Sequence, residues 1–275
     1  MGNLWKGFKE HRTFRFTSLL VILLIALVVL APVIAPYNPL EAVMKDANQA
    51  PSMAHLFGTD KLGRDVLSRI LYGGAYSLSS VLALVAIIFC VGTFLGLVAG
   101  YFGGLIDTVI MRIADMMISF PGVILAIAIA GIMGGSLVNA MIALTAVTWT
   151  KYARLSRSMV LKIRKRDFVD AAIVSGGTSS HILWTHIMPN VVPILVITAV
   201  SDIGAMMMEL AGLSFLGFGS LPPAPEWGLM LNEGRQQLQT APWLMVFPGL
   251  AIFISVVIFN LWGDALRDVL DPRDQ

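Results

Sequence analysis

Charged side chains are scarce in this chain of 275 residues: they make up 13% of it, whereas a water-soluble domain usually carries about 25%. Apolar residues make up 57% of the sequence, and its mean hydropathy is +0.79. This composition argues against a soluble core and predicts a protein that resides in a membrane. The net charge of +2 is also too small to indicate a nucleic-acid partner.

Several catalytic and ligand-binding motifs are missing. Cys90 is the single cysteine, which excludes an intrachain disulfide and a cysteine-based metal site. No glycine is followed directly by lysine, so the chain has no P-loop for the phosphates of ATP. His-x-x-x-His spacing and the Gly-x-Ser-x-Gly nucleophile motif are absent too. We therefore expect no enzymatic activity, no catalytic residue, no metal site and no cofactor bound by this chain.

Long apolar segments, in contrast, occur throughout the sequence. A helix needs about 20 apolar residues to cross the hydrocarbon of a bilayer. Six segments reach that length, at about 17–35, 77–100, 113–133, 137–156, 191–216 and 243–263. They predict an all-α integral membrane protein with six transmembrane helices. Basic residues precede the first segment, as in a signal peptide, but it is long and lacks a good cleavage site, so we interpret it as an uncleaved membrane helix.

The distribution of lysine and arginine predicts the orientation of the chain. With six spans, both termini lie on one side, and most basic residues fall there, including the run from Lys151 to Arg166. The positive-inside rule makes that side the cytoplasm. The predicted division is a cytoplasmic N-terminus (1–16), a first transmembrane helix (17–35), an external segment with an interfacial helix (36–76), a five-helix core (77–265) with a cytoplasmic loop (157–190) and an external loop (217–242), and a cytoplasmic tail (266–275).

Local patterns refine the external segment and the first span of the core. Val66, Leu67, Ile70 and Leu71 form an apolar stripe opposite Arg64 and Arg69, which predicts a helix lying at the membrane surface. In the following span, small residues recur at i, i+4 and i+8 and form a face that another helix can approach closely. These residues are Gly92, Gly96 and Gly100.

Three prolines mark expected joints between helices. Pro121 is expected to kink or start the third span. Pro189 and Pro193 are expected to open the fifth span, where a missing N–H group costs least.

The cytoplasmic loop carries the most distinctive pattern. Asp170-Ala171-Ala172 is followed by Gly176 and, thirteen residues later, by Pro189. We predict a short helix that ends at Gly176-Gly177, a second helical piece from Ser180 to Met188, and a turn back into the membrane at Pro189. Two short helices held across the membrane surface would project into a groove of another protein.

This loop resembles the EAA loop of permease subunits of binding-protein-dependent ABC importers, with Asp170 where that family usually has glutamate. The resemblance covers nearly the whole chain and favours the dipeptide, oligopeptide and nickel branch, closest in appearance to the nickel permease of the C type. Its motifs are Phe57–Asp60, Gly63–Arg69, Leu213–Gly217, Glu226-Trp227-Gly228 and Asn260–Asp268.

The resemblance implies the type I importer permease fold, a multi-pass place in the bacterial cytoplasmic (inner) membrane, and a coupling role for one set of residues in the loop. These are Asp170, Ala171, Ala172, Gly176, His186 and Pro189. It also implies a heterodimer with a homologous permease subunit, two ATPase subunits that bind ATP and Mg, an extracytoplasmic solute-binding protein, and surrounding lipid.

The fifth span contains two acids, Asp202 and Glu209, with Met206 between them. Residues at this spacing share one helix face, and acids inside a membrane are functional candidates. We expect the three residues to line the translocation path, with pairing to the partner permease as the alternative for the acids. The sequence from Asp202 to Gly217 resembles nickel permeases more than dipeptide permeases. The expected cargo is therefore a nickel ion or a nickel chelate, and di- or oligopeptide is the alternative.

Two other classes of function fit the sequence less well. A proton-coupled secondary transporter could use Asp202 and Glu209 as a relay, but it would normally have more spans in repeated halves, and the Asp170 loop would stay unexplained. A membrane assembly factor without transport is disfavoured by the branch motifs.

Overall fold

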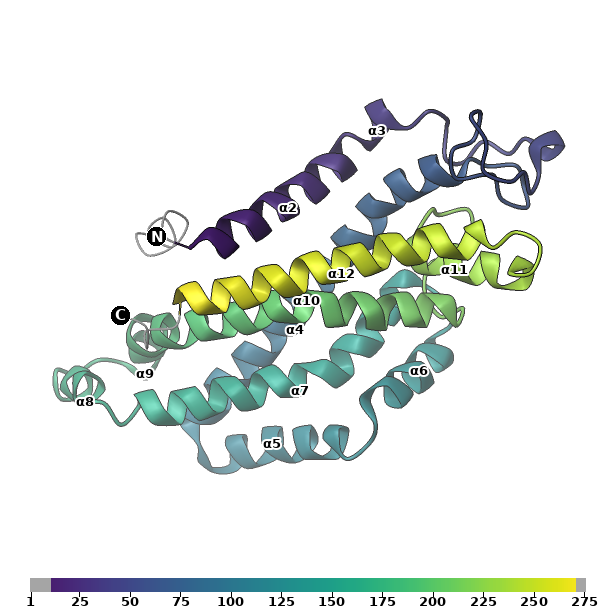
Figure 1. Cartoon of the computed structure of the whole chain (residues 1–275). Helices are drawn as coiled ribbons and strands as arrows, with labels where there is room; N and C mark the ends of the chain where they lie inside the picture. The colour runs from purple at the N-terminus through teal and green to yellow at the C-terminus, as the bar shows by residue number, and fades with distance from the viewer. Residues whose placement is uncertain (1–10, 271–275) are drawn as a thin grey trace. The chain divides into compact units, whose positions relative to one another are not determined.

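The computed structural model of the protein describes residues 11–270, and this part of the chain is helical, with one isolated β-bridge between Thr59 and Asp65 (Figure 1). The prediction of an all-helical protein is confirmed. The elements are α2 (Arg12–Val29), α3 (Ala31–Ile34), the 3-10 turn η1 (Met44–Asp46), α4 (Val66–Phe102), α5 (Gly104–Ile118), α6 (Gly122–Met133), α7 (Leu137–Ile163), α8 (Asp167–Val174), α9 (Ser179–His181), the π-helical segment η2 (Ile182–Ile187), α10 (Met188–Phe215), α11 (Trp227–Gly234), the 3-10 turn η3 (Arg235–Gln237) and α12 (Trp243–Leu270). Most of the predicted cytoplasmic N-terminus (1–16) and the end of the predicted tail (266–275) lie outside the described residues.

Long apolar helices account for the membrane-spanning capacity of the described chain. Four candidates are long and apolar enough: α2, α4, the continuous helix from Ser179 to Phe215, and α12. A fifth arises if α5 and α6 form one span, since only a short break at Pro121 separates them and the two helices are bent by 94°. The expected kink at Pro121 is thus present. Helix α7 has 27 residues, but Lys151 and Arg154 are among those that lower its apolar character, and it is not among these candidates.

The described chain divides into two compact units. The first contains residues 11–83, 130–142 and 200–270, and the second contains residues 84–129 and 143–199. In the first unit, α12 packs against α2 and α11, and one core consists of Phe14, Ala265, Leu266 and Val269. Helices α10 and α12 approach closely there, because a Cβ on Gly204 would lie only 2.2 Å from Asn260 Oδ1.

In the second unit, α4 and α7 approach each other along the predicted glycine face. A Cβ on Gly92 would lie 2.5 Å from the Cβ of Tyr152, and one on Gly96 would lie 2.3 Å from the carbonyl oxygen of Ala153. Ser156 of α7 donates a hydrogen bond to the carbonyl of Thr93 at 3.1 Å. The expectation that this glycine face receives another helix is confirmed, and the helix is α7.

Helix α5 is joined to α7 by charge within the same unit. Arg157 donates through Nη2 to Asp107 at 2.6 Å, and Arg154 pairs with Asp115. The basic residues of α7 that reduce its apolar character are therefore partly neutralised by α5.

The predicted interfacial helix in the external segment is wrong as a separate element. Helix α4 begins at Val66 and runs unbroken to Phe102. Of the stripe residues, Val66, Ile70 and Leu71 are buried as expected and Leu67 is half-buried, but Arg69 on the other side of the helix is buried as well. A surface helix would keep that guanidinium in water, whereas here carboxylates from elsewhere in the first unit neutralise it.

The α4–α7 contact generates a prediction with a matched control. Gly96→Ala is expected to lower the free energy of unfolding by about 1–3 kcal/mol, because the new methyl group would overlap a backbone carbonyl that has no rotamer to escape to. Gly131→Ala is the control, since its Cβ would lie 3.5 Å from the nearest atom, an ordinary contact. The measurement is the thermal unfolding midpoint of the purified permease complex. Equal midpoints for the two variants would contradict the close packing.

Candidate functional site

The short helix in the predicted cytoplasmic loop forms as the sequence predicts. Helix α8 carries Asp167 and Asp170 in its first turn, where negative charge is favourable next to the unpaired N–H groups. It ends because Gly176 takes a positive φ of 78°, a conformation that costs glycine little. The N–H group of Gly177 then bonds to the carbonyl of Ala172 at 3.0 Å. The expected helix break is confirmed.

The second half of the loop differs from the prediction. Thr178 caps α9 by accepting a hydrogen bond from the N–H group of His181, and α9 continues through η2 into α10 without a turn. The predicted turn at Pro189 is therefore wrong, since the helix runs without a break from Ser179 to Phe215. Helix α10 itself begins at Met188, next to Pro189 as expected, whereas Pro193 lies inside it.

The π-helical segment gives a physical reason for this continuity. In a regular α-helix, the ring of Pro189 would crowd the carbonyl of Thr185 and leave it without a donor. A wider turn just before the proline relieves that crowding. The segment η2 ends at Ile187, two residues before Pro189.

The loop has a buried side and an apolar exposed side. Val169, Ile182 and Ile187 are buried, and α8 packs against η2. Large apolar side chains remain exposed, with Val174 reaching 88%. The exposed apolar surface of the loop consists of Phe168, Ile173, Val174 and Trp184.

The predicted coupling residues lie on or next to this exposed surface. Asp170, Ala171, Gly176 and Pro189 are exposed, and Ala172 is half-buried. His186 is half-buried, with its ring centroid 5.7 Å from that of His181. The sequence pattern located the loop, but it did not single out Val174, whose exposure depends on how α8 packs against η2.

The acids of the fifth span lie on α10. Asp202 and Glu209 are both half-buried, whereas Met206 is buried at 5% exposure. The next two methionines have different surroundings again: Met207 is buried, and Met208 is 56% exposed. All three residues lie on α10, with the two acids partly accessible and Met206 covered by its neighbours. Among residues 11–270, no group of three or more His, Cys, Asp or Glu side chains could hold a metal ion.

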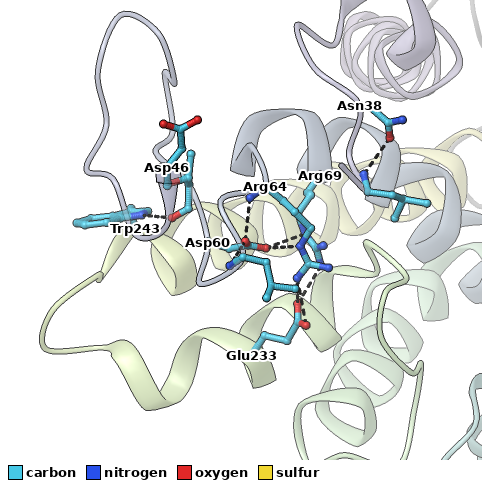
Figure 2. Close-up of polar contacts among 10 residues, drawn as sticks. Asn38, Asp46, Asp60, Arg64, Arg69, Glu233 and Trp243 are labelled. Atoms are coloured by element: carbon cyan, nitrogen blue, oxygen red, sulfur yellow. Dashed lines mark hydrogen bonds and ion pairs between the residues drawn. The ribbon is translucent and has the colours of Figure 1, made fainter. Parts of the chain in front are cut away.

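A buried ion cluster in the first unit was missed by sequence reasoning (Figure 2). Arg64 Nε lies 2.6 Å from Asp60 Oδ2, and its Nη2 lies 3.2 Å from Glu233 Oε2. Arg69 Nη2 lies 2.9 Å from the same Glu233 oxygen and its Nε 3.7 Å from Asp60 Oδ2. The two arginines are 2% and 1% exposed. We call these four residues, Asp60, Arg64, Arg69 and Glu233, the ion cluster.

The ion cluster joins the segment between α3 and α4, together with the start of α4, to the short helix α11, because Glu233 lies near the end of α11. A signal for it was present in the sequence: two arginines in a charge-poor chain need acids nearby, and Asp60 is four residues from Arg64. Glu233 is 169 residues from Arg64, so its part could not be read from local spacing.

A second polar contact fixes the start of α4. Asp65 Oδ2 accepts hydrogen bonds from the N–H group of Ser68 at 2.8 Å and from its hydroxyl at 2.7 Å, which is an N-cap arrangement. The other oxygen of Asp65 lies 2.9 Å from Nδ1 of His55. The backbone N–H group of Tyr37 donates to the Ser68 hydroxyl at 3.1 Å and ties the segment after α3 to the same point.

Glu226 caps α11 from a buried position. Its carboxylate accepts hydrogen bonds from the N–H groups of Gly228 and Leu229, both at 2.8 Å, and the residue is 3% exposed. Burial raises the pKa of Glu226 above its ordinary range, and these backbone hydrogen bonds offset the rise only in part. The next residue, Trp227, donates through its indole N–H to the carbonyl of Ile70 at 2.9 Å.

Comparison with protein families places most of the chain in one of them. Residues 92–273 match the family described as the inner membrane component of binding-protein-dependent transport systems. Residues 1–51 match the N-terminal transmembrane domain of oligopeptide transport permease C.

Three curated proteins are similar over almost the full length. The nickel transport system permease protein NikC of Escherichia coli K12 is 43% identical over 257 residues, which cover 93% of each chain. The glutathione transport system permease protein GsiD of Pectobacterium atrosepticum is 42% identical over 270 residues, 98% of this chain and 90% of that one. The dipeptide transport system permease protein DppC of Alkalihalophilus pseudofirmus is 40% identical over 269 residues, 98% of this chain and 88% of that one.

A solved structure is similar in fold. It is a chain of the methionine ABC transporter MetNI in an inward-facing conformation, with a TM-score of 0.53 and 20% identity. The match covers 72% of this chain and 96% of that one.

The buried cap generates a prediction about pH. Because the folded protein holds the Glu226 proton more tightly than the unfolded chain does, the stabilisation is complete below the ordinary value of 4.5 and is lost as the pH rises through the raised folded pKa. Glu226→Gln stays neutral and lacks this dependence. The unfolding midpoint of the wild type relative to Glu226→Gln is expected to fall as the pH rises above 4.5. Glu41→Gln, at an exposed position, is the control. A constant difference between wild type and Glu226→Gln over that range would contradict the effect of burial.

Proposed function

The chain belongs to the inner-membrane component family of binding-protein-dependent transport systems, as a type C permease of the dipeptide, oligopeptide and nickel branch, and from this premise we propose how it works. It is a permease subunit of an ABC importer, with the type I importer permease fold, and a multi-pass protein of the bacterial inner membrane. Its topology, its coupling residues, its assembly and its cargo are proposals, each argued from the described residues.

The proposed topology has six spans with both termini in the cytoplasm. Helix α7, which has 27 residues, would be about 40 Å long, more than the hydrocarbon thickness of about 30 Å. The α5–α6 pair supplies another span through its bend at Pro121. This assignment keeps the predicted division into 1–16, 17–35, 36–76, 77–265 and 266–275, with the loop 157–190 in the cytoplasm and the loop 217–242 outside.

The loop around α8 is proposed to receive force from an ATPase subunit. The observation that carries this proposal is the exposed apolar surface of the loop, Phe168, Ile173, Val174 and Trp184, next to Asp170, Ala171, Ala172, Gly176, His186 and Pro189. An apolar surface of this kind on a short helix suits a groove in another protein. Helix α8 could then move about the helix break at Gly176. The continuous helix from α9 into α10 would carry that movement to the fifth span.

The proposed assembly is a heterodimer with a homologous permease subunit, two ATPase subunits and an extracytoplasmic solute-binding protein. ATP and Mg would bind at the ATPase subunits, since this chain has no P-loop. In the proposed cycle, ATP closes the two ATPase subunits, the helices change from inward- to outward-facing, and the loaded binding protein delivers its solute at the external segments. Hydrolysis then resets the complex.

This chain is proposed to form half of the translocation pathway for a nickel ion or a nickel chelate, with di- or oligopeptide as the alternative cargo. The nickel proposal is supported by the sequence from Asp202 to Gly217 and by the two carboxylates on α10. Half-buried acids without a metal-binding cluster suit passage of a cation better than tight ligation. The similar identities to nickel, glutathione and dipeptide permeases leave the peptide alternative fully open.

The docking proposal is tested by adding a charge to the exposed apolar surface. Val174→Asp is expected to reduce ATP-driven uptake by roughly tenfold or more, because a carboxylate would be buried without a partner when the loop docks. Ser180→Asp adds the same charge at an exposed position in the first turn of α9 and is the control. The measurement is uptake by the reconstituted complex, with membrane insertion checked separately. Normal uptake by Val174→Asp would exclude this surface from docking.

The cargo is tested by uptake into proteoliposomes that contain the full complex. ATP-dependent accumulation of nickel, reduced in Asp202→Asn while ATP hydrolysis persists, is expected from the nickel proposal. Accumulation of dipeptide without nickel would establish the alternative. Uptake driven by a proton gradient and independent of ATP would instead contradict the importer mechanism for this chain.

A further inference from the structure

Two buried polar atoms, one in the ion cluster and one beside it, have no hydrogen-bond partner among the described residues. One is Nη1 of Arg69, a donor, and the other is Oε1 of Gln237, an acceptor. Arg69 is 1% exposed, so bulk water does not solvate its guanidinium. Leaving such groups unsatisfied is unfavourable, and most buried polar atoms in folded proteins have a partner, often an ordered water.

Both atoms belong to residues that line the same small cavity. The cavity has a volume of about 20 Å³ and is also lined by Asp60, Lys61, Arg64 and Glu233. One water molecule needs roughly 10–15 Å³ and two to four polar partners. The cavity therefore has room for one water and offers it a donor, an acceptor and nearby carboxylates.

We propose that one ordered water completes the ion cluster, accepting a hydrogen bond from Arg69 Nη1 and donating one to Gln237 Oε1. An anion such as chloride is the competing occupant of this size. The carboxylates of Asp60 and Glu233 line the same cavity and already neutralise both arginines. Chloride would add a third negative charge and has no proton to donate to Gln237 Oε1, whereas a neutral water satisfies both unpaired atoms.

The water would extend the ion cluster from α11 to the turn that follows it. Glu233 lies on α11, and Gln237 is the last residue of η3. With the water in place, the start of α4 is tied to both elements. The water would then help to hold residues 235–242 against the segment that precedes α4.

The first experiment removes the acceptor alone. Gln237→Met keeps the length of the side chain but cannot accept the hydrogen bond, and it is expected to lower the unfolding midpoint by several degrees and to speed amide hydrogen exchange in 235–242. Gln236→Met, at the exposed neighbouring position, is the matched control and is expected to change neither. Wild-type exchange and midpoint in Gln237→Met would overturn the proposal.

A double-mutant cycle tests the bridge itself. Arg69→Lys keeps the charge next to Glu233 but removes Nη1, so Gln237→Met should have a much smaller effect in that background than in the wild type. Additive effects would overturn a bridge between the two side chains.

Replacing chloride by gluconate should leave the wild-type midpoint unchanged, and a drop confined to proteins with Arg69 would identify an anion instead. A map of the complex that resolves waters should show one density within hydrogen-bond distance of both atoms, and an empty cavity would also overturn the proposal.

Discussion

The structure depends on one constraint: polar groups removed from water must find their partners within the protein. A membrane offers no solvent to backbone N–H and C=O groups, and helices satisfy those groups locally. The long apolar segments of the described chain are accordingly helical. The same constraint acts on side chains where they are buried. The ion cluster answers it with two buried arginines against Asp60 and Glu233. The half-buried Asp107 and Arg157 pair in the same way between α5 and α7.

Close helix approach is the second consequence of burial without solvent. Lipid is as apolar as the side chains it surrounds, so helix association gains most from tight contact between backbones. Glycine permits that contact, with Gly96 facing α7 in the second unit and Gly204 facing α12 in the first. Both contacts bring a bare Cα next to a polar atom of the neighbouring helix, Ala153 O and Asn260 Oδ1 respectively. A methyl group at either position would displace the neighbour.

Features encoded in contiguous residues could be predicted from the sequence. The apolar segments, the kink at Pro121 and the end of α8 at Gly176 all follow from local composition or from a residue with special backbone freedom. The glycine face of α4 also followed from spacing, although its partner α7 did not.

Features that depend on distant residues could not be predicted. Arg69 was placed on a solvated helix face because Glu233, which neutralises it, is 164 residues away in the chain. The continuous helix through Pro189 was missed for a related reason: a π-helical turn has no sequence signature, and without one the proline indicates a helix start. Glu226 was noticed only as part of a motif, yet it caps α11 from inside the fold.

The proposed coupling loop and the proposed translocation path differ in how far this one chain completes them. The loop around α8 is built from local signals and presents its apolar surface within one chain. Helix α10 instead leaves Met208 exposed beside an apolar groove of about 510 Å³ that Phe215 and Phe253 also line. If such a surface is completed by a second permease, the pathway and its selectivity belong to the pair and to the binding protein. Permeases for nickel, glutathione and dipeptide are 40–43% identical to this chain, so overall identity does not separate these cargoes from one another.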